Sequence, residues 1–200
     1  TAMGACLRHR GPDEKGTFRS GPVGFSHRRL SIVDLQTGRQ PIFNEDETIC
    51  VVFNGELYNY RSLRDRLRAA GHTFRTETDT EVLVHGYEQW GRSVVERIEG
   101  MFAFALWDGD RERVVLTRDP MGIKPLYVGQ DGHRVAFASE LSALFEAEFD
   151  LGGLDRRALS AYFCLGFVPA PRTAFDNVEK LSPGTVATVT ADGIKRRSFY

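Results

Sequence analysis

The stretch "MFAFALWDGDRERVVLTRD", Met101–Asp119, contains two β-prone runs separated by a short loop-like segment. The runs "MFAFALWD" and "RVVLTRD" are rich in the apolar, aromatic and β-branched residues that favour strands. The connecting "GDRE" has the length and the turn residues of a hairpin loop. The stretch therefore predicts two antiparallel strands that are neighbours in a sheet.

More β structure is predicted on both sides of this hairpin. Toward the C-terminus, "PLYVGQ" and "RVAFAS" flank the Asp-Gly pair at 131–132, and "TVATVTADGIKRRSFY" is centred on the Asp-Gly pair at 192–193. Both patterns predict further hairpins. Toward the N-terminus, "TICVVF" predicts a strand, and Leu30 to Val33 form a shorter β-prone run.

Helices are predicted between the strands. In "RSLRDRLRAAGH", Leu63, Leu67 and Ala70 repeat at helical spacing, and Gly71 stands where a C-terminal cap is expected. "ALSAYFCLGF" predicts a short apolar helix.

The segment "TDTEVLVHGYEQWG" predicts another helix. Thr78 and Glu81 have the spacing of a capping box, and Asp79 falls in the expected first turn, where negative charge is favoured. The apolar stripe and the terminating glycine of this helix are Leu83, Tyr87, Trp90 and Gly91.

These elements predict an α+β fold in which helices pack on largely antiparallel sheets, and not a doubly wound parallel sheet. The two helices that follow "VVFNGELYNY" are expected to share one face of a sheet. A chain of 200 residues is long enough to bury its own core, so a single domain over 1–200 is expected.

Composition excludes several classes of function. The net charge of −1 provides no basic face for nucleic acid, and no apolar run approaches the roughly 18 residues of a membrane-spanning helix. Gly-rich phosphate loops are absent, so nucleotide binding by this chain is not expected. The five histidines show no metal-ligand spacing, so no metal site is expected.

The three cysteines, Cys6, Cys50 and Cys164, are far apart in the sequence and form no CxxC pair. This pattern argues against a disulfide framework and fits a reducing cytoplasm. All three are expected to be small core or near-core residues.

Four stretches contain more charged, polar and turn-forming residues than a purely structural role requires: "RHRGPD", "HRRLSIVD", "FNGELYNY" and "RDPMGIKPLY". Each has a structural interpretation, namely a Gly-Pro turn, a solvated strand edge, an Asn-Gly hairpin and a dense turn. The functional interpretation of Asn54-Gly55 is a corner that stabilises an anion in an active site. The local pattern alone favours the hairpin.

The order of these stretches resembles the glutamine amidotransferase domain at the N-terminus of asparagine synthetases. The resemblance covers essentially the whole chain and includes "GMFAFA", "FASE", "GFVPAPRTAF" and "LSPG". Phosphoribosyl-pyrophosphate amidotransferases and glucosamine-phosphate synthases share only part of the pattern. The β-lactam synthetases share the architecture and are a closer rival.

The resemblance implies an N-terminal-nucleophile αββα sandwich, in which the nucleophile is a cysteine at the mature N-terminus and its own α-amine is the base. No Cys-Gly-Ile start is present here. Cys6 is expected in a helix before "RHRGPD" and has no α-amine of its own. The nucleophile and the first strand are therefore expected upstream of this chain, which alone should hydrolyse no glutamine.

The resemblance also implies the rest of a glutaminase site, without a metal. The Asn54 side-chain amide and the Gly55 N–H should form the oxyanion hole, in a turn at the end of a strand. Arg29 should bind the α-carboxylate of L-glutamine, and Asp79 its α-ammonium. "RHRGPD" and "RDPMGIKPLY" should support the pocket. The remaining substrate-binding positions are Leu30, Ile32 and Glu56.

The implied protein is a cytoplasmic asparagine synthase (glutamine-hydrolysing), and this chain is its glutaminase module. Residues 150–200 should close the module and lead to a C-terminal synthetase domain that uses ATP and Mg²⁺, whereas the module itself should need no cofactor. A homodimer is possible in such families. The alternatives are a relative that amidates another carboxylate and an inactive amidotransferase-like interaction domain.

Overall fold

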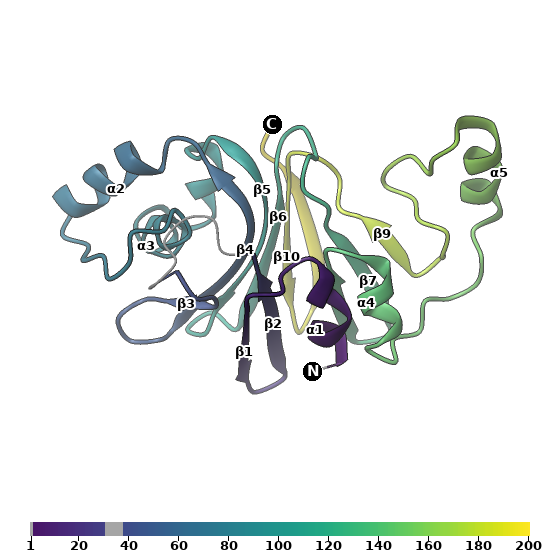
Figure 1. Ribbon diagram of the computed structural model, residues 1–200, viewed down its shortest axis with the longest axis horizontal. Coiled ribbons are helices and arrows are strands. Elements are labelled where there is room, and N and C mark those ends of the chain that lie inside the picture. The colour runs from purple at the N-terminus through teal and green to yellow at the C-terminus, as the bar shows by residue number, and fades with distance from the viewer. Residues whose placement is uncertain (1, 31–37) are drawn as a thin grey trace.

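The structure, a computed structural model, describes residues 2–30 and 38–200 (Figure 1). The helices are α1 Ala2–Cys6, α2 Tyr60–Ala69, α3 Glu81–Trp90, α4 Leu141–Phe145 and α5 Arg156–Leu165, with short 3-10 turns at Leu7–His9 and Gly91–Glu96. The strands are β1 Glu14–Ser20, β2 Val23–Arg29, β3 Ile42–Phe43, β4 Ile49–Leu57, β5 Gly100–Asp108, β6 Arg113–Arg118, β7 Tyr127–Asp131, β8 Arg134–Ala138, β9 Val178–Lys180, β10 Thr185–Thr190 and β11 Gly193–Ser198.

The predicted hairpin of β5 and β6 lies at the centre of a six-stranded sheet in the order β11-β10-β6-β5-β4-β3. Its register runs from Ala103 opposite Arg118 to Asp108 opposite Arg113. The β7–β8 and β10–β11 hairpins also form, and every strand pair in the described residues is antiparallel. The predicted α+β class is confirmed.

Strand β4 overturns both predictions for Asn54-Gly55. These residues form neither a hairpin nor a turn at a strand end, because β4 continues through them to Leu57. Asn54 lies opposite Ala103 and Gly55 opposite Phe102 on β5. The long pairing with β5 keeps the backbone extended where the local Asn-Gly pattern alone favours a turn.

Helices α2 and α3 share the outer face of this sheet, as predicted. Leu63, Leu67 and Leu83 are almost fully buried there against strands β4 and β5. Gly71 and Gly91 end the two helices with φ of +101° and +59°. The prediction for Ala70 was wrong, because α2 ends at Ala69 and Ala70 is exposed.

The predicted capping box of α3 does not form. The helix begins at Glu81 with Thr80 as its N-cap residue, so Asp79 precedes the helix and does not lie in its first turn. The Glu81 carboxylate instead accepts hydrogen bonds from the backbone N–H groups of Arg75 and Thr76. The carboxylate is therefore used to hold the loop before the helix.

A second layer of strands lies on the other face of the six-stranded sheet. It comprises the β1–β2 hairpin and a sheet in the order β8-β7-β9. Phe25, Val52, Leu116 and Leu126 belong to the apolar core between the layers. Helices α1 and α4 cover the outer side of the second layer, opposite α2 and α3, which completes the αββα order (Figure 1).

The cysteines are placed differently from one another. Cys50 is fully buried, and burial raises the pKa of its thiol to about 12. Cys6 is half-buried at the end of α1, the helix expected there. The prediction for Cys164 was wrong, because this residue is exposed on α5.

The helices of the described chain are all too short to cross a membrane.

Candidate active site

One cavity of about 1080 Å³ gathers the predicted site residues. It lies where the end of β2, the second half of β4 and the segment before α3 meet, and it extends between the two layers of strands. Ile32 lies outside the described residues. The cavity is lined by Arg29, Leu30, Asn54, Gly55, Glu56 and Asp79, together with apolar residues of β5 and β8.

The direction of the Gly55 N–H follows from the sheet pairing. In antiparallel pairs, opposite residues alternately exchange both backbone hydrogen bonds and none. Phe102, the partner of Gly55, uses its backbone N–H and C=O on Asp119, beyond β6. Gly55 and Phe102 are therefore a non-hydrogen-bonded pair, and the Gly55 N–H points away from β5.

The neighbours of Gly55 in the same row confirm this direction. The Phe53 N–H donates to Gln40 Oε1 at 2.6 Å, and the Leu57 N–H donates to Asp79 Oδ2 at 2.9 Å. The Gly55 N–H lies between these two donors, on the edge of β4 that borders the cavity. The strand thus presents a backbone donor there.

The Asn54 side chain lies on the inner face of the sheet. Side chains alternate along a strand, so Asn54 shares its face with Val52 and Cys50, which belong to the core between the layers. Asn54 is half-buried and lines the cavity. Its amide and the adjacent Gly55 N–H are two donors of the kind that an oxyanion requires.

Arg29 ends β2 with its side chain buried. Its Nη1 donates to Glu14 Oε2 at 2.8 Å, and these two residues are direct partners in the β1–β2 register. A guanidinium carries five N–H donors in a fixed fork, so it can bind a second carboxylate beside the first. Leu30 follows Arg29 directly and is 55% exposed, whereas the rest of the β-prone run predicted from Leu30 to Val33 lies outside the described residues.

Asp79 connects the end of β4 to the start of α3. Its Oδ2 accepts the hydrogen bond from Leu57, and its Oδ1 accepts one from Thr78 Oγ1 at 3.2 Å. Burial raises the pKa of the Asp79 carboxyl, and the hydrogen bonds only partly oppose this effect. A buried carboxylate of this kind is stabilised by a cation placed next to it.

Two polar residues near the site were missed by the sequence reasoning. Gln40 Nε2 and His27 Nε2 both lie 3.1 Å from the Phe53 carbonyl oxygen, one residue before Asn54. Burial lowers the pKa of His27 to about 4, so the imidazole is neutral and donates from Nε2. His27 falls in the "HRRLSIVD" motif, whereas no sequence signal distinguishes Gln40.

The other two motifs form loops that are held by charged side chains. Asp119 accepts hydrogen bonds from the backbone of Met121, Ile123 and Lys124, which holds the "RDPMGIKPLY" turn. In "RHRGPD", His9 and Arg10 bind Glu140, the last residue of "FASE". These contacts fix loops around the cavity.

Residues 1–200 match the family model described as the glutamine amidotransferase domain. The chain belongs to this family. Solved structures agree on the fold: the glutamine phosphoribosylpyrophosphate amidotransferase from B. subtilis superposes with a TM-score of 0.63 at 21% identity, over 88% of this amidotransferase domain and 35% of that chain.

Curated relatives of this amidotransferase domain are asparagine synthetases. It is 44% identical over 191 residues to asparagine synthetase [glutamine-hydrolyzing] 1 of Bacillus subtilis, which covers 96% of this chain and 30% of the relative. It is 42% identical over 199 residues to a putative asparagine synthetase of Mycobacterium tuberculosis, covering 93% and 30%. The chain thus spans about 30% of the length of these relatives.

Proposed function

We propose that this chain is the glutaminase module of an asparagine synthetase, which hydrolyses L-glutamine to glutamate and supplies ammonia for the amidation of aspartate. One observation carries the proposal. The Asn54 amide and the Gly55 N–H line the same cavity as the Arg29 guanidinium and the Asp79 carboxylate. Donors for a carboxamide and partners for an α-amino acid therefore face one space.

The chemistry at the carboxamide end is nucleophilic attack on a carbonyl carbon. The carbonyl oxygen gains negative charge as the tetrahedral intermediate forms, and fixed donors stabilise that charge. The Gly55 N–H is fixed by the strand, because its neighbours Phe53 and Leu57 are hydrogen-bonded in the same direction. Loss of one oxyanion donor typically costs about 2.7–4 kcal/mol in the transition state.

The amino-acid end uses two opposite charges. Arg29 would bind the α-carboxylate beside its existing partner Glu14, and Asp79 would accept the α-ammonium. The ammonium would also offset the cost of burying the Asp79 charge, since an adjacent opposite charge favours the ionised carboxylate.

The attacking cysteine would come from a strand upstream of residue 1. The second layer supports this assignment, because in the described residues β2 pairs with β1 alone and β8 with β7 alone. The apolar side chains Phe25, Phe137, Ala103 and Ala105 line the cavity next to these two strands. A strand that pairs with β2 or β8 would enter the cavity beside Asn54.

The decisive experiment measures glutaminase activity of the complete protein. Asn54→Ala and Asp79→Ala should each lower kcat/KM for glutamine, the first by roughly 10²–10³-fold if it removes an oxyanion donor. Synthesis with free ammonia should continue in both variants. Asp65→Asn, on the exposed side of α2, is the matched control. Unchanged kcat/KM in both site variants would refute the assignment.

An inactive interaction domain is the second candidate function. None of the cysteines in this chain lines the cavity, and Cys50 is a buried thiol with a strongly raised pKa. The 200-residue chain alone should therefore release no ammonia from glutamine. Glutamine-saturable ammonia release by this chain would contradict that expectation, and a complete protein without activity would favour the inactive domain.

The acceptor and the surroundings of the module are part of the proposal. ATP and Mg²⁺ would act in a C-terminal synthetase domain of the same polypeptide, in the cytoplasm, and homodimers are an expected assembly. The relatives named above support aspartate as the acceptor over another carboxylate. Analysis of the amidated product with each candidate acid identifies the acceptor.

A further inference from the structure

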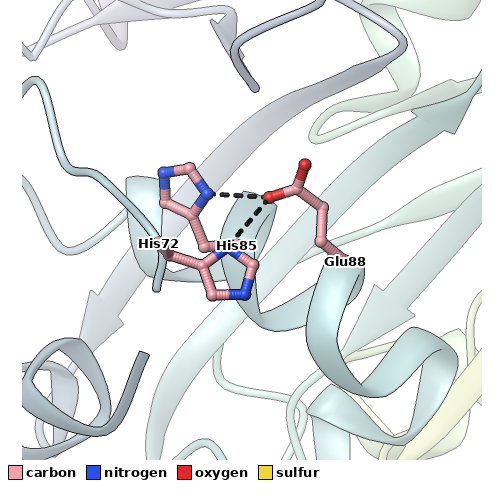
Figure 2. Close-up of side chains that lie close together, drawn as sticks. All are labelled: His72, His85 and Glu88. Atoms are coloured by element: carbon pink, nitrogen blue, oxygen red, sulfur yellow. Dashed lines mark hydrogen bonds and ion pairs between the residues drawn. The ribbon is translucent and has the colours of Figure 1, made fainter. Parts of the chain in front are cut away.

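Two histidines and a glutamate meet beside helix α3 (Figure 2). His72 follows α2, whereas His85 and Glu88 are one turn apart on α3. One ligand atom from each side chain lies within 4.8 Å of the other two. The sequence spacing had predicted no such cluster, because packing of α2 on α3 brings His72 to His85 across 13 positions. None of the three residues lines the cavity described above.

The ligand atoms of this cluster are close enough together to share one small metal ion. His85 Nδ1 lies 2.8 Å from Glu88 Oε2, and His72 Nδ1 lies 3.4 Å from the same oxygen. Ligands at about 2.0–2.1 Å from a tetrahedral Zn²⁺ are roughly 3.3–3.4 Å apart. Only small side-chain shifts would therefore be needed to seat the ion.

The second ring nitrogen of each histidine also faces an acceptor. His72 Nε2 lies 3.1 Å from Gln89 Oε1, and His85 Nε2 faces Glu81 Oε1 at 3.6 Å. Both Nδ1 atoms face the Glu88 carboxylate (Figure 2), so with the protons on Nε2 their lone pairs would point at an ion bound there. Metal-binding histidines are typically oriented by such partners on their second nitrogen.

Glu88 is held in the same way. Its Oε1 accepts a hydrogen bond from Asn44 Nδ2 at 2.9 Å, while its Oε2 faces both histidines. Without an ion, His85 Nδ1 donates a hydrogen bond to this oxygen, and a bound metal ion would replace that proton.

The buried histidine adds a separate observation. The side chain of His85 is 1% exposed, and its Nε2 is buried without a hydrogen bond of normal geometry. Coordination at Nδ1 withdraws electron density from the ring, so the Nε2–H becomes a stronger donor toward Glu81. His72 is half-buried and Glu88 is exposed, so an ion can enter from solvent.

We propose that His72, His85 and Glu88 bind one Zn²⁺, with water completing a tetrahedral site. Two imidazoles and one carboxylate suit zinc, whereas Mg²⁺ and Ca²⁺ prefer oxygen ligands alone. The ion would join the segment after α2 to α3. Its effect is structural stabilisation of this helix pair.

The test measures Zn²⁺ binding to the full chain after removal of metal with a chelator. Calorimetric titration with zinc chloride should give one site per chain, and the Tm should rise with added Zn²⁺. His72→Ala and Glu88→Gln should each abolish both effects, and neither change touches a fully buried side chain. His133→Ala, an exposed histidine in the β7–β8 turn, is the matched control and should bind as the wild type does.

Two further measurements separate this site from adventitious binding. Co²⁺ should give the visible absorption of a tetrahedral site with nitrogen and oxygen ligands, without the thiolate charge-transfer band that binding at Cys164 would produce. Gln89→Ala should weaken Zn²⁺ binding by roughly 10–100-fold, as expected for loss of an orienting partner. The proposal fails if the wild type binds no more Zn²⁺ than His72→Ala, or if the thiolate band dominates.

Discussion

Gly55 is a glycine because β5 leaves no room for a side chain. A Cβ atom at this position would lie 2.1 Å from the Met101 carbonyl oxygen and 2.8 Å from the Phe102 Cα. Both are backbone atoms of the neighbouring strand and cannot rotate away. The same close approach lets the backbone that carries the proposed oxyanion donor lie directly against β5.

Gly55→Ala should therefore destabilise the fold by about 1–3 kcal/mol, the usual cost of forcing a methyl group into a filled site. Urea unfolding measures this loss. Gly24→Ala is the control, because Gly24 is also in a strand and a Cβ there meets nothing closer than 3.7 Å. Equal stability of the two variants would contradict the steric reason.

His27 should make the fold sensitive to mild acid. Its pKa is lowered to about 4 by burial, whereas an unfolded histidine has a pKa near 6.5. Between these values the unfolded chain binds more protons, so the free energy of unfolding falls as the pH falls from 6.5 to 4, by about 3 kcal/mol at most. Above pH 6.5 His27 is neutral in both the folded and the unfolded chain, so it should add little to the pH dependence of the free energy of unfolding.

Unfolding curves of the wild type and His27→Gln across pH 4–7 measure this contribution. The glutamine can still donate to the Phe53 carbonyl oxygen but cannot be protonated. The variant should therefore show a smaller loss of stability on acidification. Parallel pH profiles for the two proteins would show that His27 is not the sensitive group.

At the scale of single residues, the ordered motifs predicted Asn54, Gly55, Arg29 and Asp79, and the structure places all four on one cavity. The sequence could not show that the Gly55 N–H points away from β5, because this direction depends on the register with Phe102. The exposure of the Cys164 side chain on α5 likewise could not be predicted from the sequence.

At the scale of elements, Glu81 holds the loop that leads to Asp79. Its carboxylate accepts from Arg75 N and Thr76 N at 2.8 Å each, and from Thr76 Oγ1 at 2.7 Å. Burial would raise the pKa of Glu81, but the nearby His85 imidazole and the hydrogen bonds from Arg75 and Thr76 outweigh burial and lower it to about 2. This carboxylate therefore stabilises the fold above the unfolded pKa, near 4.5, and loses that effect as the pH falls toward 2.

Glu81→Ala should lower the free energy of unfolding by at least about 2 kcal/mol, because the donors it leaves are no longer satisfied. The loop would loosen, so KM for glutamine should rise in the complete protein more than kcat falls. Asp65→Asn again serves as the control for loss of a helix carboxylate. A stability loss without any change in KM would separate Glu81 from the position of Asp79.

The start of α3 shows why a local sequence pattern cannot predict the residue at which a helix begins. The period of Leu83 and Tyr87 predicted the helix correctly, since it reflects the face that packs on the sheet. The capping-box pattern failed because Glu81 is buried against the preceding loop, where backbone N–H groups compete for it. Tertiary contacts therefore determine whether the Glu81 carboxylate caps the helix or binds the preceding loop.

At the scale of the whole molecule, α5 projects away from the two layers of strands (Figure 1). It exposes large apolar side chains, with Phe163 at 83%, Leu165 at 56% and Tyr162 at 50%. Clustered exposed apolar residues commonly mark interaction surfaces. We expect this helix to contact the synthetase domain proposed above.

Phe163→Asp should change the stability of the 200-residue chain by no more than about 0.5 kcal/mol, because the side chain is exposed there. The complete protein should lose about 1.5–3 kcal/mol, the value of burying one large apolar side chain. Chemical unfolding of the 200-residue chain and of the complete protein, each with and without the substitution, measures the two losses of stability. Equal effects in the two would show that α5 remains exposed.

The overall fold was more predictable than the site. Hairpin spacing between "MFAFALWD" and "RVVLTRD" gave the antiparallel sheet, and helical periodicity placed α2 and α3 on its outer face. The grouping of β1–β2 with β8-β7-β9 in a second layer was available only through the family resemblance. Long-range packing of this kind leaves little trace in local sequence.

The hydrogen bond between Asp79 and the Leu57 N–H also has a consequence for selectivity. Leu57 is two residues beyond Gly55, so the proposed ammonium acceptor is attached to the strand that carries the proposed oxyanion donors. The distance between the two ends of the substrate is thereby fixed by the protein. We expect asparagine, one methylene shorter, to satisfy one end at a time, so the site discriminates amino-acid amides by reach.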